Sequence, residues 1–423
     1  MRRRLAITVF MLLICLTGIC GTIPLLPRDP SVVCGSLRGG LTYYILRSEN
    51  AETGIEIACI TRSGRETFRR SGIDASRADA LRRSLSDARN SLEPVSQAII
   101  IVGDVIPADV EKMLVSRFSD LPDIPQEPRT VRSTVPNRSS GPQIEVITTG
   151  SRSDCRVELN WQDSPMPQEL NSTEVRFNND LIQRIIAIVM DERLAAASSP
   201  ADAPISDAQF RFERRLTGSG ADITDNTVVT ADIIGEYIRE AIASLLNEIS
   251  KMSGKGFSDD EVERAKSLLL LQMQMDADNA GALTDSQLIS LLADDYIYGL
   301  TFTGADAACR LARTAMKWLD AGLISETASQ LIPDDSDEDL FVTIFCPEDC
   351  SVPSPKELTA LIAEARQSGA SGTVTVRQKK DDDAVGQTDA RKSGRQERQA
   401  RKQERKAAKN AAKAGKADRK KRK

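Results

Sequence analysis

The spacing of hydrophobic residues predicts a compact strand and helix region over residues 35–122. Residues 41–46 and 54–61 are short runs rich in β-branched and aromatic side chains, and the polar turn between them favours a hairpin. Apolar positions recur at helical spacing between residues 74 and 92, and Ala98-Ile-Ile-Ile-Val102 is short and β-branched, as in a buried strand. Pro107 then opens an amphipathic helix that ends at Leu121-Pro122.

A second region follows residues 123–142, a segment whose prolines, serines and charges are typical of a linker. Its pattern predicts strands at 144–148, 156–161, 209–214, 227–232 and 340–345. Helices are predicted at 173–197, 233–252, 283–298 and 305–331. One more begins at Ser258-Asp-Asp-Glu261, where the serine and the glutamate form a capping box. We therefore expect a second domain at residues 143–350.

The first 26 residues have the layout of an export signal. Three arginines follow Met1, and an uncharged apolar stretch comes next, as in a signal peptide. The stretch is also long enough to cross a bilayer, so a signal anchor is the alternative. Both interpretations predict an exported protein of the periplasm or cell envelope.

Charge is distributed unevenly along the chain. The net charge is -5, but residues 391–423 contain 16 basic and 3 acidic residues, about +13, which leaves about -18 for the rest. An acidic body and export both argue against nucleic acid as a partner. After a helical extension at 351–378, the basic low-complexity tail at 379–423 is either a solvated appendage or an anchor to an anionic membrane surface.

Cysteine usage fits a compartment that permits disulfides. Cys346 and Cys350 are the candidate close disulfide, and buried free thiols are the alternative. These two cysteines cannot complete a four-ligand zinc site without a second pair of ligands. An even number of cysteines lies beyond the leader, namely Cys34, Cys59, Cys155, Cys309, Cys346 and Cys350.

Several passages resemble the pitrilysin/insulinase zinc peptidases in order as well as in kind. Gly40-Leu-Thr-Tyr-Tyr-Ile45 resembles the first strand of the opening domain of that family, and residues 99–107 with 118–122 resemble its strand-turn-helix passage. In the second region, residues 157–161, Asp191-Glu-Arg-Leu194 and residues 255–266 resemble successive landmarks of the domain after the linker. The resemblance covers residues 36–364.

This resemblance implies an α+β fold with two insulinase-like domains, each an antiparallel sheet with helices packed on one face. Such a pair forms half of a clam-shell chamber that encloses extended peptides. Members of the family hold a catalytic zinc ion through His-x-x-Glu-His and a further glutamate. This chain has no histidine, and the passage from Glu66 to Asp74 leaves no room for the metal-binding helix. We therefore expect a shortened first domain with no catalytic residues, no metal ligands and no cofactor.

The absence of histidine also excludes Ser-His-Asp and Cys-His catalysis. The resulting hypothesis is a pseudoenzyme that binds extended peptides or serves as the partner subunit of an active zinc peptidase paralogue. Two alternatives stay open. One is a metallopeptidase with an unrecognised site or a site completed by a partner chain, and the other is an envelope-associated structural protein.

Overall fold

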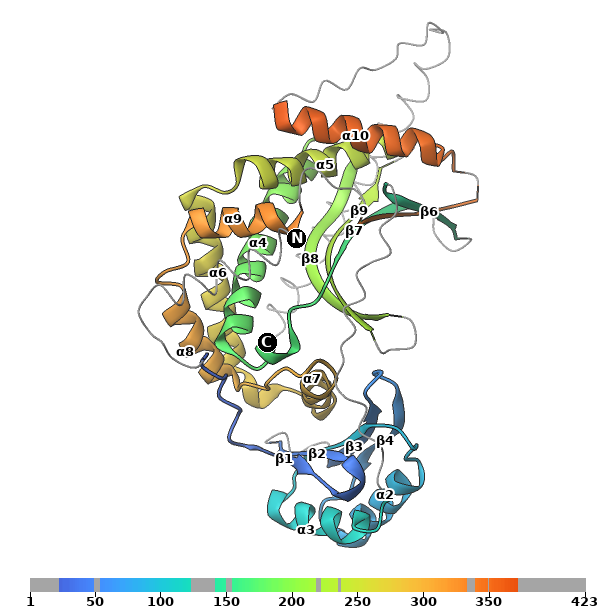
Figure 1. Cartoon of the computed structure of the whole chain (residues 1–423), viewed down its shortest axis with the longest axis vertical. Helices are drawn as coiled ribbons and strands as arrows, with labels where there is room; N and C mark the ends of the chain where they lie inside the picture. Colours follow the sequence, from blue (N-terminus) through green and yellow to red (C-terminus); the bar gives the residue numbers. More distant parts are fainter. Residues whose placement is uncertain are drawn as a thin grey trace, which may run out of the picture. The chain divides into compact units, whose positions relative to one another are not determined.

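The computed structural model describes residues 23–48, 54–122, 141–149, 154–217, 222–234, 237–332, 339–348 and 350–371 (Figure 1). These residues form two five-stranded sheets with helices packed on them. Most of the predicted leader, the linker and the whole basic tail lie outside the described residues. Within the described ranges, no helix combines the length and apolar character that crossing a membrane requires.

The first sheet has the strand order β1-β2-β5-β3-β4. Its central strand β5 pairs in parallel with β2 and antiparallel with β3. Every residue of β5 is buried, so this β-branched run needs a neighbour on both edges and cover on both faces. The bounds are β1 (Val32–Ser36), β2 (Thr42–Arg47), β3 (Ile55–Thr61), β4 (Glu66–Ile73) and β5 (Gln97–Gly103).

The hairpin predicted from residues 41–46 and 54–61 is wrong, because β5 inserts between β2 and β3. The pattern reveals that both segments are strands but not which strand pairs with which. Strand β4 escapes prediction for another reason. Its sequence Glu66-Thr-Phe-Arg-Arg70 lacks apolar alternation, since it is an edge strand whose side chains are largely exposed.

Helices cover both faces of the first sheet. Two helices, α2 (Ala78–Asn90) and α3 (Pro107–Phe118), pack on one face. The other face is covered by α7 (Asp285–Tyr298), which comes from the second half of the chain and lies on the side away from α2 and α3 (Figure 1). Five α7 side chains are buried against this face, namely Leu288, Ile289, Leu292, Ala293 and Tyr296.

The second sheet has the strand order β6-β10-β7-β9-β8, and its helices gather on one face (Figure 1). The α+β class with two sheets is thereby confirmed, and each sheet contains one parallel pair, β2 with β5 and β6 with β10. Its strands are β6 (Gln143–Thr148), β7 (Cys155–Asp163), β8 (Ile205–Thr217), β9 (Asp222–Ile233) and β10 (Leu340–Cys346). Its helices are α4 (Glu174–Ser198), α5 (Ile238–Lys255), α6 (Asp259–Asp278), α8 (Ala305–Ala315), α9 (Ala321–Leu331) and α10 (Pro355–Ser371).

The single helix predicted at 305–331 is two helices. The chain leaves α8 after Ala315, and α9 begins at Asp320, whose carboxylate accepts a hydrogen bond from the Leu323 N–H at 2.8 Å. An aspartate at this position satisfies one of the free N–H groups at a helix start. The predicted capping box at Ser258 and Glu261 is confirmed at the start of α6.

Two landmarks of the family resemblance meet at a joint between α4 and α6. Arg193 of α4 donates to both carboxylate oxygens of Glu261, at 2.8 and 3.0 Å, and to the Gly256 carbonyl at 2.9 Å. Its guanidinium also lies 4.8 Å from the centre of the Phe257 ring. The hydrogen bond from Arg193, with those from Ser258, lowers the pKa of Glu261 to about 2.

A second polar joint fastens α7 to the first sheet. Asp295 is buried, with 5% of its side chain exposed, and it receives two hydrogen bonds from Arg28, at 2.5 and 3.2 Å. It also accepts from the Tyr44 hydroxyl at 3.0 Å and from the Phe302 N–H at 2.9 Å. These donors satisfy the buried carboxylate, which fixes α7 in one position over the sheet.

Asp295→Asn should destabilise the folded chain by about 2 kcal/mol, because it leaves the Arg28 guanidinium without its partner carboxylate. Urea unfolding followed by circular dichroism measures the loss. Asp294→Asn is the matched control, since the neighbouring residue is exposed, and its effect should stay within about 0.5 kcal/mol. Equal losses in the two variants would contradict the role assigned to Asp295.

Glu261→Gln should cost about 1 to 3 kcal/mol at pH 7. The pKa of Glu261 in the folded chain, about 2, lies below its ordinary value of 4.5. The ionised carboxylate therefore contributes fully above about pH 4.5, and its contribution is lost as the pH falls towards 2. Unfolding free energies of wild type and variant should converge over that range. Asp260→Asn, on the same exposed turn, should cost less than about 0.5 kcal/mol, and a pH-independent gap for Glu261→Gln would argue against the joint.

Candidate functional site

The stretch after β3 is where the resemblance to the zinc peptidases implies a metal-binding helix. Instead, a short turn leads from Thr61 directly into β4. The carboxylates near this turn are held by arginines, Glu93 by Arg65 and Glu66 by Arg69. Across the part of the chain that the structure describes, no group of three or more histidine, cysteine, aspartate or glutamate side chains could hold a metal ion. The residues present do not fit the zinc ion of that family.

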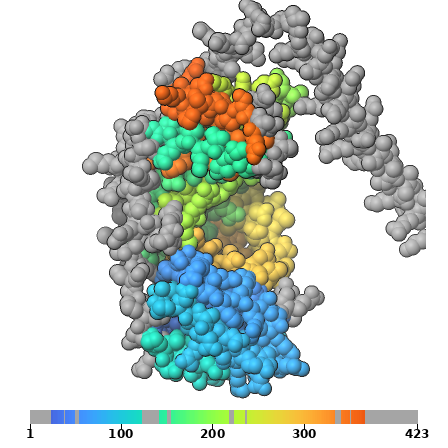
Figure 2. All heavy atoms as spheres, turned by 90° about the vertical axis from the view of Figure 1, so that its right-hand side faces the viewer, coloured from blue at the N-terminus to red at the C-terminus, as the bar shows by residue number. Residues whose placement is uncertain are grey.

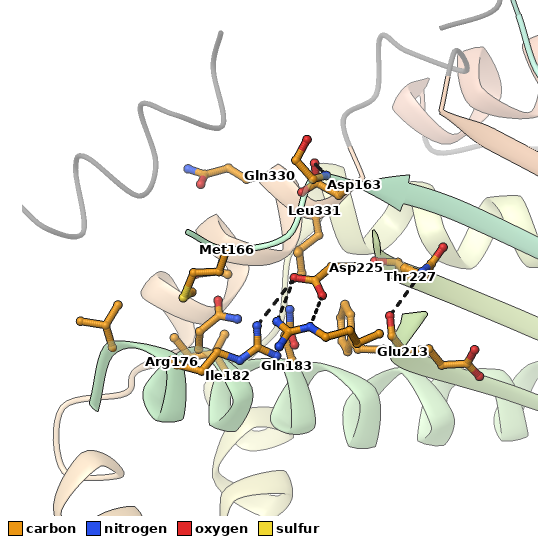
Figure 3. A pocket seen from close by; sticks show the side chains of 17 residues that line it. Asp163, Met166, Arg176, Ile182, Gln183, Glu213, Asp225, Thr227, Gln330 and Leu331 are labelled. Carbon is orange, nitrogen blue, oxygen red and sulfur yellow. Dashed lines mark hydrogen bonds and ion pairs between the residues drawn. The ribbon is translucent and has the colours of Figure 1, made fainter. Parts of the chain in front are cut away.

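A cleft of about 200 Å³ opens beside the second sheet. It lies between α4, the β8–β9 pair, the end of α9 and the segment that follows β7 (Figure 3). A cavity of about 150 Å³ accepts a molecule the size of benzene, so this cleft has room for one anchoring side chain. Its apolar wall consists of Met166, Val175, Ile182, Phe212 and Leu331.

Two arginines share one aspartate on the polar wall of the cleft. Arg214 Nε donates to Asp225 Oδ1 at 2.8 Å, and Arg176 Nη1 lies 3.6 Å from Asp225 Oδ2. Arg176 also pairs with Asp180 at 2.8 Å, and Figure 3 shows Arg176 and Asp225 pointing toward each other. The arginine side chains are only 11% and 10% exposed, so these pairings compensate the cost of burying their charge. The cleft therefore offers fixed polar groups beside an apolar wall.

The outer edge of β8 borders this cleft. The Phe210 N–H donates to Asp191 Oδ1 of α4 at 2.7 Å, so it points away from β9. Because backbone groups alternate along a strand, the N–H and C=O groups of Phe212 and Leu216 face the same outer side. The pairing of β8 with β9 runs without a register shift from Gln209 to Thr217. This part of β8 is a regular edge, on which Arg214 faces the same outer side and its carbonyl accepts a hydrogen bond from the Tyr298 hydroxyl at 3.5 Å.

Strand β4 and the first part of β8 carry features that prevent pairing. The pairing of β4 with β3 has two register shifts, and the exposed side chains of β4 include Arg69 and Arg70. The first part of β8 has a register shift after Ser206 and a left-handed residue, Asp207, with φ of 48°. Bulges and charges of this kind protect sheet edges from unwanted strands. The regular part of β8, next to the cleft, lacks the register shifts of these two segments.

The face of the second sheet opposite its helices carries ion pairs within and across its strands. Arg215 of β8 lies 2.6 Å from Glu213 of the same strand and 3.3 Å from Glu158 of β7, across β9. Arg156 of β7 lies 3.6 Å from Asp232 of the neighbouring β9. Figure 2 looks onto this side of the molecule, where the yellow-green atoms of β8 and β9 are visible. Such cross-strand pairs support the register of the sheet. The cleft is the stronger candidate for recognition, because it combines paired charges with an apolar wall.

The candidate disulfide partners, Cys346 and Cys350, lie at the end of β10 and beyond the turn that follows it. The structure brings a third cysteine to this place. Cys155, at the start of β7, has its Sγ 3.1 Å from Cys350 Sγ. Sequence spacing alone suggested the local pair, because a contact between residues so far apart along the chain leaves no pattern in the sequence.

The cleft residues were not singled out from the sequence. Charged residues in amphipathic segments usually face solvent, so Arg176 and Asp225 give no signal of their own. Arg214 offers a weak one. It stands two residues after Phe212 and four after Phe210, and alternation places all three on one face of β8. A charge on the apolar face of a strand is a candidate polar group inside a pocket.

Comparison with protein-family models matches residues 92–269 to the peptidase M16 inactive domain. Comparison with curated protein sequences finds no match. Among solved structures, the first half of the periplasmic protease PqqL from Escherichia coli is similar, with a TM-score of 0.66 at 12% identity over 83% of this chain and 99% of that chain. A predicted insulinase family protease from Yersinia pestis gives a TM-score of 0.60 at 10% identity, over 82% of this chain and 99% of that chain.

Two longer proteases show how much of a full-length chain is matched. A variant of the ferredoxin protease FusC, in complex with Arabidopsis ferredoxin, gives a TM-score of 0.55 at 12% identity over 82% of this chain and 51% of that chain. The whole PqqL chain is also covered to 51%. This chain therefore spans about half the length of these two proteases. Residues 92–269 thus match the peptidase M16 inactive domain, and the fold of the chain is similar to that of these insulinase-type proteases.

Proposed function

We propose that this protein is a non-catalytic, insulinase-like binding subunit that holds an extended polypeptide at the cleft and at the regular edge of β8. The observation that carries the proposal is the position of that edge directly beside a cleft with fixed polar groups and an apolar wall. A strand added to β8 gains main-chain hydrogen bonds, and its alternate side chains project to the face where the cleft lies. Affinity then comes from the backbone, and specificity comes from the side chain that enters the cleft.

The volume of the cleft limits what enters it. About 200 Å³ accepts one aliphatic or aromatic side chain, and the Arg176–Asp225–Arg214 cluster at its wall favours a side chain with a polar tip. Because each arginine is paired with an aspartate, the cluster carries little net charge. A tyrosine-like anchor fits this combination better than a strongly charged side chain does.

A partner chain belongs to the proposal. The chain spans about half the length of the PqqL and FusC chains. The structure of FusC in complex with ferredoxin is an example of a protein of this fold engaging another polypeptide. We propose an active zinc peptidase paralogue as the partner, with this chain contributing binding rather than chemistry.

Export is part of the same proposal. The basic and apolar start of the chain is the layout of a signal peptide or signal anchor, and the similar protease PqqL is periplasmic. A location in the periplasm or at the cell envelope would let the basic tail meet an anionic membrane surface. Retention of the purified protein on anionic vesicles, compared with neutral ones, measures that contact.

Filling the cleft should weaken peptide binding by about tenfold or more, about 1.4 kcal/mol. Asn179→Trp is the test, since Asn179 of α4 lines the cleft and an indole there occupies the space of an anchoring side chain. The probe is a pool of short, unstructured, fluorescein-labelled peptides in which one central position carries each aliphatic or aromatic residue in turn. Fluorescence anisotropy measures binding to the full chain.

Asn178→Trp is the matched control. It makes the same substitution on the preceding residue of the same helix, which does not line the cleft, so binding should be unchanged. Circular dichroism checks that both variants fold. The proposal fails if no peptide in the pool binds, or if the two variants bind equally. Cleavage of the peptides that stops on chelation would instead support the alternative of a metallopeptidase with an unrecognised or partner-completed site.

A further inference from the structure

Three cysteines from distant parts of the sequence converge at one end of the second sheet. In the antiparallel pairing of β7 with β10, Phe345 lies opposite Arg156. The next position in that register therefore sets Cys346, the last residue of β10, beside Cys155, the first residue of β7. Neighbouring antiparallel strands bring such opposed side chains to within contact distance.

Cys350 joins this pair through a turn. Its N–H donates to the Pro347 carbonyl at 3.2 Å, which folds the chain back toward the sheet. The turn brings Cys350 Sγ to 3.1 Å from Cys155 Sγ, across 195 positions of sequence. Cys155 and Cys346 are 4% and 2% exposed, whereas Cys350 is partly exposed. The group thus has one reachable thiol and two buried ones.

We propose that Cys155 and Cys350 are a disulfide-forming site, in which the partly exposed Cys350 is oxidised first and then bonded to Cys155. The 3.1 Å contact joins Cys350 to Cys155. Cys346 also interacts with Cys350, so the local bond that sequence spacing suggests is the competing product. The bond between Cys155 and Cys350 connects distant segments and restricts the unfolded chain far more than a bond across one turn does. The proposal is independent of peptide binding at the cleft.

The chemistry needs a small-molecule disulfide, such as oxidised glutathione, as the oxidant. The Cys350 thiolate attacks one sulfur of that disulfide and expels the first glutathione thiolate, which leaves a mixed disulfide on Cys350. The Cys155 thiolate then attacks the Cys350 sulfur and expels the second glutathione thiolate. Two electrons pass from the protein thiols to glutathione, and the two protons released by the cysteines end on the two glutathione thiols.

The order of events follows from burial. Burial and the contact with Cys350 raise the pKa of Cys155 to about 12, so little of it is ionised at neutral pH. Burial also raises the pKa of Cys346. The more accessible Cys350 is therefore the entry point for the oxidant. Cys155 reacts second, when the mixed disulfide holds an electrophilic sulfur next to it.

The bond would fasten the start of the C-terminal helix to the sheet. Cys350 lies between β10 and α10, and α10 buries Leu358, Ile362 and Ala365 in the core of the second half. A disulfide at Cys350 ties the segment between β10 and α10 to the first residue of β7. Oxidation should therefore raise the melting temperature by a few degrees and slow proteolysis of the segment 350–371.

The test uses the full chain, equilibrated in a mixture of reduced and oxidised glutathione and then treated with iodoacetamide. Digestion with an endoproteinase that cuts after glutamate separates Cys346 from Cys350 at Glu348. Mass spectrometry should find the Cys155 peptide joined to the Cys350 peptide, with Cys346 alkylated. A bond between Cys346 and Cys350, or three alkylated thiols in folded protein, overturns the proposal.

Variants separate this bond from general effects of cysteine loss. Cys346→Ser should keep the Cys155–Cys350 link and the higher melting temperature of the oxidised form. Cys350→Ser should remove both, so that oxidised and reduced samples melt together. Cys309→Ser is the matched control, because Cys309 is buried in the same core at 3% exposure but belongs to α8. A Cys350→Ser variant that retains the oxidation-dependent rise in melting temperature also overturns the proposal.

Discussion

Strand β5 is apolar on both faces, and the arrangement of the described chain follows from covering both. Helices α2 and α3 bury one face, and α7 buries the other from a position late in the second half of the sequence. Each of the buried α7 side chains Leu288, Ile289 and Leu292 contributes about 1.5 to 3 kcal/mol when it leaves water. Detaching α7 would expose both the apolar face of this helix and the apolar face of the first sheet to water. The two sheets are consequently parts of one compact unit.

Partly buried ion pairs fix the positions of two helices in this packing. Asp295 holds α7 over the first sheet, and Arg193 holds the start of α6 against α4. Buried ion pairs contribute less to net stability than their short distances suggest, since desolvation offsets much of the attraction. Their directional hydrogen bonds nevertheless distinguish one packing from its neighbours. The family landmarks at residues 191–194 and 255–266 gain a physical meaning here, because they are the two sides of one joint.

The same scaffold explains why the candidate site lies where it does. Helix α4 is tied to β8 through Asp191 at Phe210, and the cleft lies farther along this helix and strand, where Arg176 and Arg214 share Asp225. Tyr298, the last residue of α7, stands 5.6 Å from the Arg214 guanidinium, so the helix that covers the first sheet also contacts the polar wall of the cleft. A fold does not by itself specify an activity, and here the argument for binding rests on this edge and cleft.

The sequence by itself determined most of the segments that are strands or helices, and it excluded chemistry that depends on histidine. The β-branched run at 98–102, the capping box at Ser258 and the lack of histidine are local or compositional facts, so they can be read without knowing any contact. Tertiary structure decided the pairing of β2 with β5, the edge role of β4, the seat of α7, the cleft around Asp225 and the approach of Cys155 to Cys350. The physical reason is that periodicity reports that a side chain is buried, but the partner that buries it is chosen by packing between segments far apart along the chain.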